Sequence, residues 1–95
     1  MTGLDQYCSV ADYVVSKEIE SKKVLLNLDN GNYYTLNATA SFIFDQCDGK
    51  TTLEQIAAAL AGRFDIPLEE ARKDVIDLIE DLEREGIAEA DASPR

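Results

Sequence analysis

The 95 residues suffice for one small domain with a single modest core. The apolar fraction of 45% indicates a globular chain, and no apolar run reaches the length that a membrane span needs. Nineteen acidic and nine basic residues give a net charge of −10, which argues against nucleic acid and anionic lipid as partners. The charge favours a basic or mixed-charge partner, although acidity can also serve solubility alone.

The first half of the chain reads as an antiparallel meander of three strands. Residues 1–12 show no clear period and are predicted to be a loosely ordered lead. They lack the features of a signal peptide, so we expect a cytoplasmic protein. Tyr13-Val14-Val15 with Ile19 suggests a first strand, and residues 24–28 alternate as a second. Asp29-Asn30-Gly31 is a strong hairpin turn, after which residues 32–36 return as a third strand.

The second half reads as three helices. Asn37 is a good N-cap for a helix through Cys47, and Thr51 with Glu54 has the spacing of a capping box for a second helix. Pro67 suits the first turn of a third helix, and Gly86 ends it. Residues 87–90 are expected to be a short extended piece, and residues 91–95 a frayed tail. The sequence therefore predicts one α+β domain over residues 13–90, with a three-stranded antiparallel sheet followed by three helices.

The residues that usually carry catalysis or bind metals are scarce. The chain has no histidine, which removes the commonest general base and the commonest metal ligand. Cys8 falls in the expected mobile lead, whereas Cys47 sits in an apolar helical pattern that predicts a small buried side chain. The glycines are scattered, so no phosphate-binding loop is indicated. We predict no enzyme activity, no metal and no cofactor.

The third predicted strand lies at an edge of the meander and has no protection against a further strand. Native sheets protect free edges with charge or proline, and residues 32–36 contain neither. An unprotected edge can accept a strand from another chain. The alternative is that the third helix or the C-terminal segment covers this edge.

The third helix has a wide apolar stripe beside a polar face rich in acids. With Val75 at the centre of the stripe, Ile79 lies within about 60° of it and Ile76 about 100° away, beside Arg72 and Glu83. Ile76 and Ile79 could therefore line a shallow groove, although a broader core contact explains the pattern equally well. The many acids of this helix have the usual pattern of a solvated face.

Several of these runs, in this order and spacing, resemble the PqqD family. They are Leu36-Asn37-Ala38-Thr39-Ala40, Cys47-Asp48-Gly49-Lys50-Thr51, Glu54-Gln55-Ile56, and Asp74-Val75 followed by Leu78, Leu82 and Gly86. The resemblance covers residues 13–88. The hairpin of residues 25–37 is similar to stand-alone members that accompany lasso-peptide and other peptide-modifying enzymes. Gln46 departs from the Leu that is common in members closest to the quinone-cofactor pathway.

The resemblance implies a winged-helix-like fold and a peptide-binding function. The implied partners are the leader segment of a ribosomally made precursor peptide and a modifying enzyme, such as a radical SAM enzyme or a leader peptidase. The leader would add beside the third strand and pack on the third helix, with Arg72 holding an acidic leader residue and Lys73 assisting. The predicted peptide-binding residues are Tyr33, Tyr34, Thr35, Leu36, Arg72, Lys73, Val75, Ile76, Ile79 and Glu83. Two alternatives stay open: a winged-helix DNA-binding regulator, and an adaptor subunit of an unrelated complex.

Overall fold

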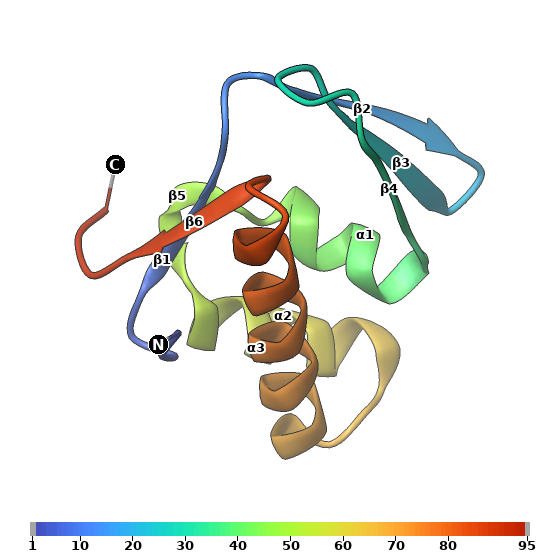
Figure 1. The fold of residues 1–95 in the computed structure, drawn as a ribbon. Coiled ribbons are helices and arrows are strands. Elements are labelled where there is room, and N and C mark those ends of the chain that lie inside the picture. The colour runs from blue at the N-terminus through green and yellow to red at the C-terminus, as the bar shows by residue number, and fades with distance from the viewer. Residues whose placement is uncertain (1, 95) are drawn as a thin grey trace.

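The computed structural model describes residues 2–94, which form three helices and two small antiparallel sheets (Figure 1). This confirms the α+β class, while the likeness to a winged helix stays a prediction. No helix of the described range is long and apolar enough to cross a membrane. In chain order the elements are β1 (Tyr7–Val10), β2 (Val14–Ile19), β3 (Lys22–Asn27), β4 (Tyr33–Leu36), α1 (Ala38–Asp45), β5 (Asp48–Thr52), α2 (Leu53–Phe64), α3 (Leu68–Arg84) and β6 (Ala88–Asp91).

The predicted meander is the sheet β2-β3-β4. Strands β2 and β3 pair in register from Val14 opposite Asn27, and β3 and β4 pair from Leu26 opposite Tyr33. The predicted turn joins β3 to β4, and Gly31 has a φ of 77° there, a conformation that costs glycine little. All three predicted strands are confirmed, with ends that differ by a residue or two.

The face of the meander that meets the core carries two polar side chains. Leu25 is fully buried, and Lys23 and Asn27 are buried on the same face. The Lys23 ammonium pairs with Asp45 of α1 at 3.1 Å, and this hydrogen bond raises the pKa of Lys23. The Asn27 side-chain oxygen accepts from the backbone N–H of Asp29 at 2.9 Å. Both polar groups are tolerated inside because each has a partner.

The N-terminal segment belongs to a second sheet, ordered β5-β1-β6. The prediction that residues 1–12 form a loose lead is therefore wrong for β1. This strand pairs with β6 from Tyr7 opposite Asp91 to Val10 opposite Ala88, so β6 also reaches one residue into the predicted tail. Cys8 is fully buried rather than mobile. Its strand is ordered by β5 and β6, which lie far away in the sequence, so the local pattern does not reveal it.

The helix starts follow ordinary capping chemistry. Asn37 caps α1, and its side-chain oxygen accepts a first-turn N–H at 2.8 Å, as predicted. The capping box of α2 is formed by Thr52 and Gln55, each donating its N–H to the other's side chain, at 2.9 and 3.1 Å. The predicted pair, Thr51 and Glu54, is one residue early, because α2 begins at Leu53 and Thr52 is its N-cap.

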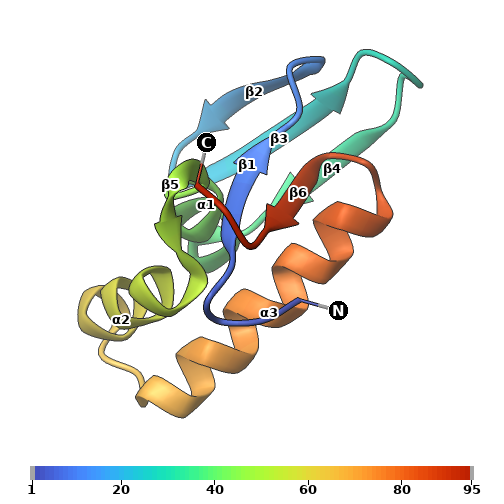
Figure 2. The same cartoon turned by 90° about the vertical axis from the view of Figure 1, so that its left-hand side faces the viewer.

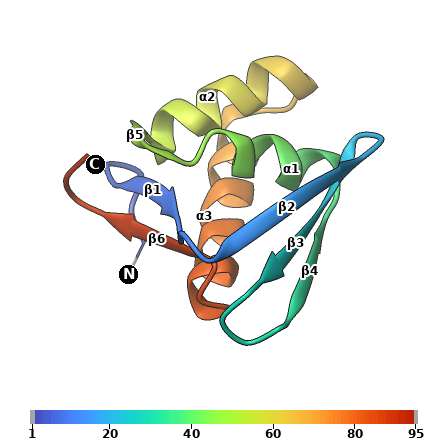
Figure 3. The same cartoon turned by 90° about the horizontal axis from the view of Figure 1, so that it is seen from above.

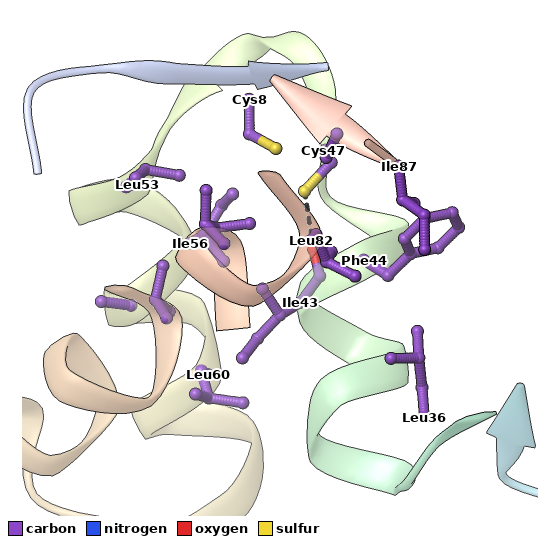
Figure 4. Packing of buried hydrophobic residues seen from close by; sticks show 14 of the residues in the cluster. Cys8, Leu36, Ile43, Phe44, Cys47, Leu53, Ile56, Leu60, Leu82 and Ile87 are labelled. Atoms are coloured by element: carbon purple, nitrogen blue, oxygen red, sulfur yellow. Dashed lines mark hydrogen bonds between the residues drawn. The ribbon is translucent and has the colours of Figure 1, made fainter. Parts of the chain in front are cut away.

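The core lies between the helices and the two sheets, and both cysteines are inside it. In Figure 4 the sulfur atoms of Cys8 and Cys47 turn toward each other between β1 and the end of α1. The neighbouring Cys8 thiol, together with burial, raises the pKa of the Cys47 thiol, which donates to the carbonyl of Ile43 at 3.5 Å. Cys47 is thus a small buried side chain, as predicted. The helix α3 contributes Ala71, Val75, Ile79 and Leu82 to this core, all fully buried.

Candidate functional site

The strand β4 forms an open edge of the meander sheet. It pairs with β3 on one side, and its other side meets no strand among residues 2–94. The C-terminal strand β6, which was one candidate to cover this edge, pairs with β1 instead. Figure 3 shows β4 on the outside of the fold, with β3 between it and β2. Since β4 contains neither charge nor proline, its edge is unprotected in the folded domain.

The hydrogen-bonding groups that β4 offers at this edge follow from the sheet register. The backbone N–H of Asn27 donates to the carbonyl of Asn32, directly opposite, at 2.9 Å. Because bonded and non-bonded pairs alternate in an antiparallel ladder, Tyr34 and Leu36 direct their backbone groups toward β3. Tyr33 and Thr35 direct theirs toward the open edge. The edge therefore offers two residues, Tyr33 and Thr35, which are separated by one residue, for pairing with an added strand.

The side chains of β4 alternate between the two faces of the sheet. Leu36 is buried and Tyr34 half-buried on the inner face, whereas Tyr33 and Thr35 are exposed on the outer face. The outer face continues into a shallow apolar hollow of about 280 Å³, and Tyr33 forms part of its wall. The other lining residues belong to β2 and β3: Val15, Ser16, Lys17, Ile19, Val24 and Leu26.

A second hollow, which we call the inner groove, lies between α1 and α3 and begins at Asn37, the residue that follows β4. Its volume is about 320 Å³, and its lining residues are Asn37, Thr39, Ala40, Ile43, Asp74, Asp77, Leu78 and Asp81. Figure 2 shows β4 near the C-terminal half of α3, where Asp81 and Glu85 act electrostatically on Tyr34 of β4. The inner groove therefore has apolar side chains from both helices and three carboxylates from one of them.

The negative charge of α3 also acts on a residue of β4. Burial raises the pKa of the Tyr34 phenol, and the negative charges of Asp81 and Glu85 raise it further. The nearby guanidinium of Arg84 opposes this shift. The shift places Tyr34 within electrostatic reach of the last turns of α3. The acidic face of α3 therefore lies near β4 in the fold.

The structure does not bring all the predicted site residues to this groove. Val75 and Ile79 are fully buried and have no surface for a partner. Lys73 pairs with Asp77 at 2.7 Å on the exposed side of α3. The remaining three, Arg72, Ile76 and Glu83, lie on the flank of α3 that faces away from the inner groove, about 60–100° from Val75.

The contacts of Arg72 and Glu83 fix this orientation of α3. The Nε of Arg72 donates to Glu54 of α2 at 2.9 Å, and the guanidinium also contacts Glu69. The Arg72 contact lowers the pKa of the Glu54 carboxyl. Glu83 accepts from the hydroxyl of Thr2 at 2.6 Å and from the N–H of Ala90 at 3.3 Å. The groove expected between β4 and Arg72 is therefore not formed, because α2 and the N-terminal segment occupy that flank.

The residues that take their place are Asp74, Leu78 and Asp81. Relative to Val75 they lie about 60–120° away in the opposite direction from Ile76. The sequence pattern shows two margins of the apolar stripe, one with Ile76 and one with Leu78. It does not show which margin faces the sheet, since that depends on how α3 packs against α2. The signal for Leu78 was present, but the choice between the margins needed the tertiary structure.

Fold and site together define a small α+β domain in which an open strand edge adjoins an acidic groove. The chain belongs to the PqqD family, because the family model for coenzyme PQQ synthesis protein D (PqqD) matches residues 22–88. No match to a curated protein was found.

Two solved structures are similar to the chain. One is TbiB1 in complex with the TbiA(beta) leader peptide, with a TM-score of 0.78 and 27% identity over 85% of this chain and 94% of that one. The other is a lasso peptide synthetase B1 complexed with the leader peptide, with a TM-score of 0.71. At 22% identity, over 86% of this chain and 96% of that one, this second likeness shows the fold alone.

Proposed function

We propose that this domain binds the leader segment of a ribosomally made precursor peptide and presents it to a modifying enzyme, without catalysing a reaction itself. The observation that carries the proposal is the open edge of β4 beside the inner groove. An extended peptide pairs with such an edge through its backbone, while side-chain pockets select the sequence. The similar TbiB1 structure, a complex with a leader peptide, supports this function.

The proposed geometry is an added strand antiparallel to β4. Its backbone would exchange hydrogen bonds with Tyr33 and Thr35, the two residues that face the open edge. Its side chains would alternate between the outer face and the inner groove. The side chains opposite Tyr34 and Leu36 would enter the groove. The modifying enzyme, a radical SAM enzyme or a leader peptidase, would act in the cytoplasm on the segment that follows the leader.

Amide hydrogen exchange tests this geometry residue by residue. The probe is a peptide selected on the immobilised protein from a displayed library of randomised peptides of leader length, hereafter the selected peptide. In the free protein the N–H groups of Tyr33 and Thr35 face the open edge and should exchange fast, whereas that of Tyr34 is already bonded to β3. Adding the selected peptide should slow exchange at Tyr33 and Thr35 and leave Tyr34 unchanged.

Two outcomes would count against the proposal. The first is a selection in which no peptide is enriched above the bare support. The second is a bound peptide that protects amides elsewhere, for instance on α2, and leaves β4 unchanged. Presentation is a separate step, tested by co-purifying the protein with a radical SAM enzyme or leader peptidase encoded beside its gene. Retention of that enzyme should increase when the precursor peptide is present.

A further inference from the structure

The three carboxylates of the inner groove are not matched by positive charge inside it. Asp77 pairs with Lys73 at 2.7 Å, and Asp81 pairs with Arg84. Both pairs join residues of the same helix, and all four side chains are about half exposed or more. Asp74 makes no hydrogen bond or ion pair with any residue of the described range, and it is half-buried. The groove beside β4 thus has a net negative charge.

The partners of Asp77 and Asp81 do not line the groove. Lys73 and Arg84 lie about 160–180° from Val75, on the side of α3 that faces solvent. Exposed pairs of this kind contribute little to stability, so a cation that enters the groove can share or replace them at small cost. A groove with fixed negative charge and a partly apolar floor, formed by Ala40 and Leu78, is complementary to a long basic side chain with an apolar stem.

An added strand would deliver side chains to this groove at defined positions. The side chains opposite Tyr34 and Leu36 point inward, because β4 alternates and an added strand alternates with it. The position opposite Tyr34 lies nearest Asp81 and Glu85, whose charges raise the pKa of Tyr34. The position opposite Leu36 lies next to Asn37, which lines the groove. Two peptide residues, with one other residue between them, therefore face the groove.

We propose that the peptide segment bound along β4 carries a lysine or arginine at one of these two groove-facing positions, and that Asp74 and Asp81 select it. This inference rests on the proposed function and adds the chemistry of the partner. It reverses the prediction of an acidic leader residue held by Arg72, because Arg72 is engaged with Glu54 on the other flank. The competing reading, in which the acids only solvate α3, predicts no charge preference in the bound peptide.

The test compares the charge of peptides that the protein selects from the randomised library. Wild-type protein should enrich lysine and arginine over aspartate and glutamate at one position of the paired segment. The double variant Asp74→Asn/Asp81→Asn should lose this preference and bind the wild-type selected peptide about fivefold more weakly for each carboxylate removed. The matched control Asp65→Asn/Glu80→Gln removes two charges outside the groove and should keep both preference and affinity.

The outcomes separate this inference from the proposed function. Selected peptides that pair with β4 but show no basic preference would overturn the inference and leave the function intact. An equal loss in the control variant would also overturn it, since the effect would then come from overall charge. If no selected peptide protects the Tyr33 and Thr35 amides, the proposed function itself fails. Circular dichroism of both variants establishes that they remain folded.

Discussion

Replacing Thr35 with proline should block the open edge of β4 without breaking the sheet. Proline has no backbone N–H, and its ring projects where that N–H would point. The N–H of Thr35 faces the open edge, so no bond to β3 is lost, and edge strands are where sheets accept proline. We expect the free energy of unfolding of Thr35→Pro to fall by less than about 1 kcal/mol.

The effect on peptide binding should be much larger. A strand added antiparallel to β4 exchanges hydrogen bonds with Tyr33 and Thr35, and the substitution removes one donor. The peptide carbonyl that it served then remains unpaired in the interface, and the lost bond and the unpaired carbonyl together cost about 2–3 kcal/mol. This free energy corresponds to a dissociation constant that is roughly 30- to 150-fold weaker.

The same sheet provides a matched control on its opposite edge. The N–H of Leu28 donates to the carbonyl of Tyr13, which by alternation directs the backbone N–H of Ser16 away from β3. Ser16→Pro therefore makes the same chemical change at the edge of β2. Fluorescence anisotropy with the labelled selected peptide measures binding, and urea unfolding measures stability. Wild-type affinity in folded Thr35→Pro, or an equal loss in Ser16→Pro, would refute binding by strand addition to β4.

Three further predictions follow from the structure. Glu54→Gln should lower stability near neutral pH. The contact with Arg72 lowers the pKa of Glu54 below its ordinary 4.5, so its contribution is present above that value and is lost as the pH falls through the lowered pKa. The stability difference from the wild type in urea unfolding should then shrink as the pH is lowered below 4.5. Cys8→Ser should lower the free energy of unfolding by about 1–3 kcal/mol, because it places a hydroxyl in the core, whereas a loose N-terminal lead would predict no change. Duplex DNA should give no gel shift with micromolar protein at about 0.15 M salt, and a clear shift would favour the regulator alternative.

Local patterns predicted the meander and the helices because their signals are local. Asn37 caps a helix through its own side chain, and Gly31 lies in a turn formed by adjacent residues. The strand β1 could not be found in this way. This strand has only four residues of mixed polarity, and it is held in place by pairing with β5 and β6. The error for Cys8 has the same cause, since its burial depends on elements that follow much later in the chain.

The meander shows how an alternating pattern can mislead about burial. Val24 and Leu26 lie on one face, as their spacing requires, but that face is turned outward and only half covered. The core side carries Leu25 between Lys23 and Asn27. Packing against α1 decides which face is covered, and the ion pair from Lys23 to Asp45 makes the polar face acceptable there. Hydrophobicity alone would have predicted that the face with Val24 and Leu26 packs against the core.

The open edge of the candidate site could be predicted because its signal is local. Tyr33 to Leu36 form the open edge that their lack of charge indicated, because a missing protective residue is a local property of the strand. The role of the third helix in peptide binding stays a prediction, but the structure turns Asp81 rather than Arg72 toward β4. Arg72 is a plausible anchor for a carboxylate in the sequence alone. In the folded chain Glu54 already supplies that carboxylate, and α2 comes from a segment whose packing the sequence pattern does not describe.

The acidity of this domain affects both what its open edge accepts and what it rejects. An unprotected strand can in principle pair with the same strand of a second copy, which is how such edges lead to aggregation. Here two copies of β4 would bring two acidic grooves together, in chains that each carry a net charge of −10, so electrostatic repulsion opposes self-pairing. A basic peptide, by contrast, is attracted to the same edge by this negative charge. The carboxylates of α3 can therefore protect β4 from its own copies while leaving it open to a partner of the right charge, so this strand does not need a charge of its own.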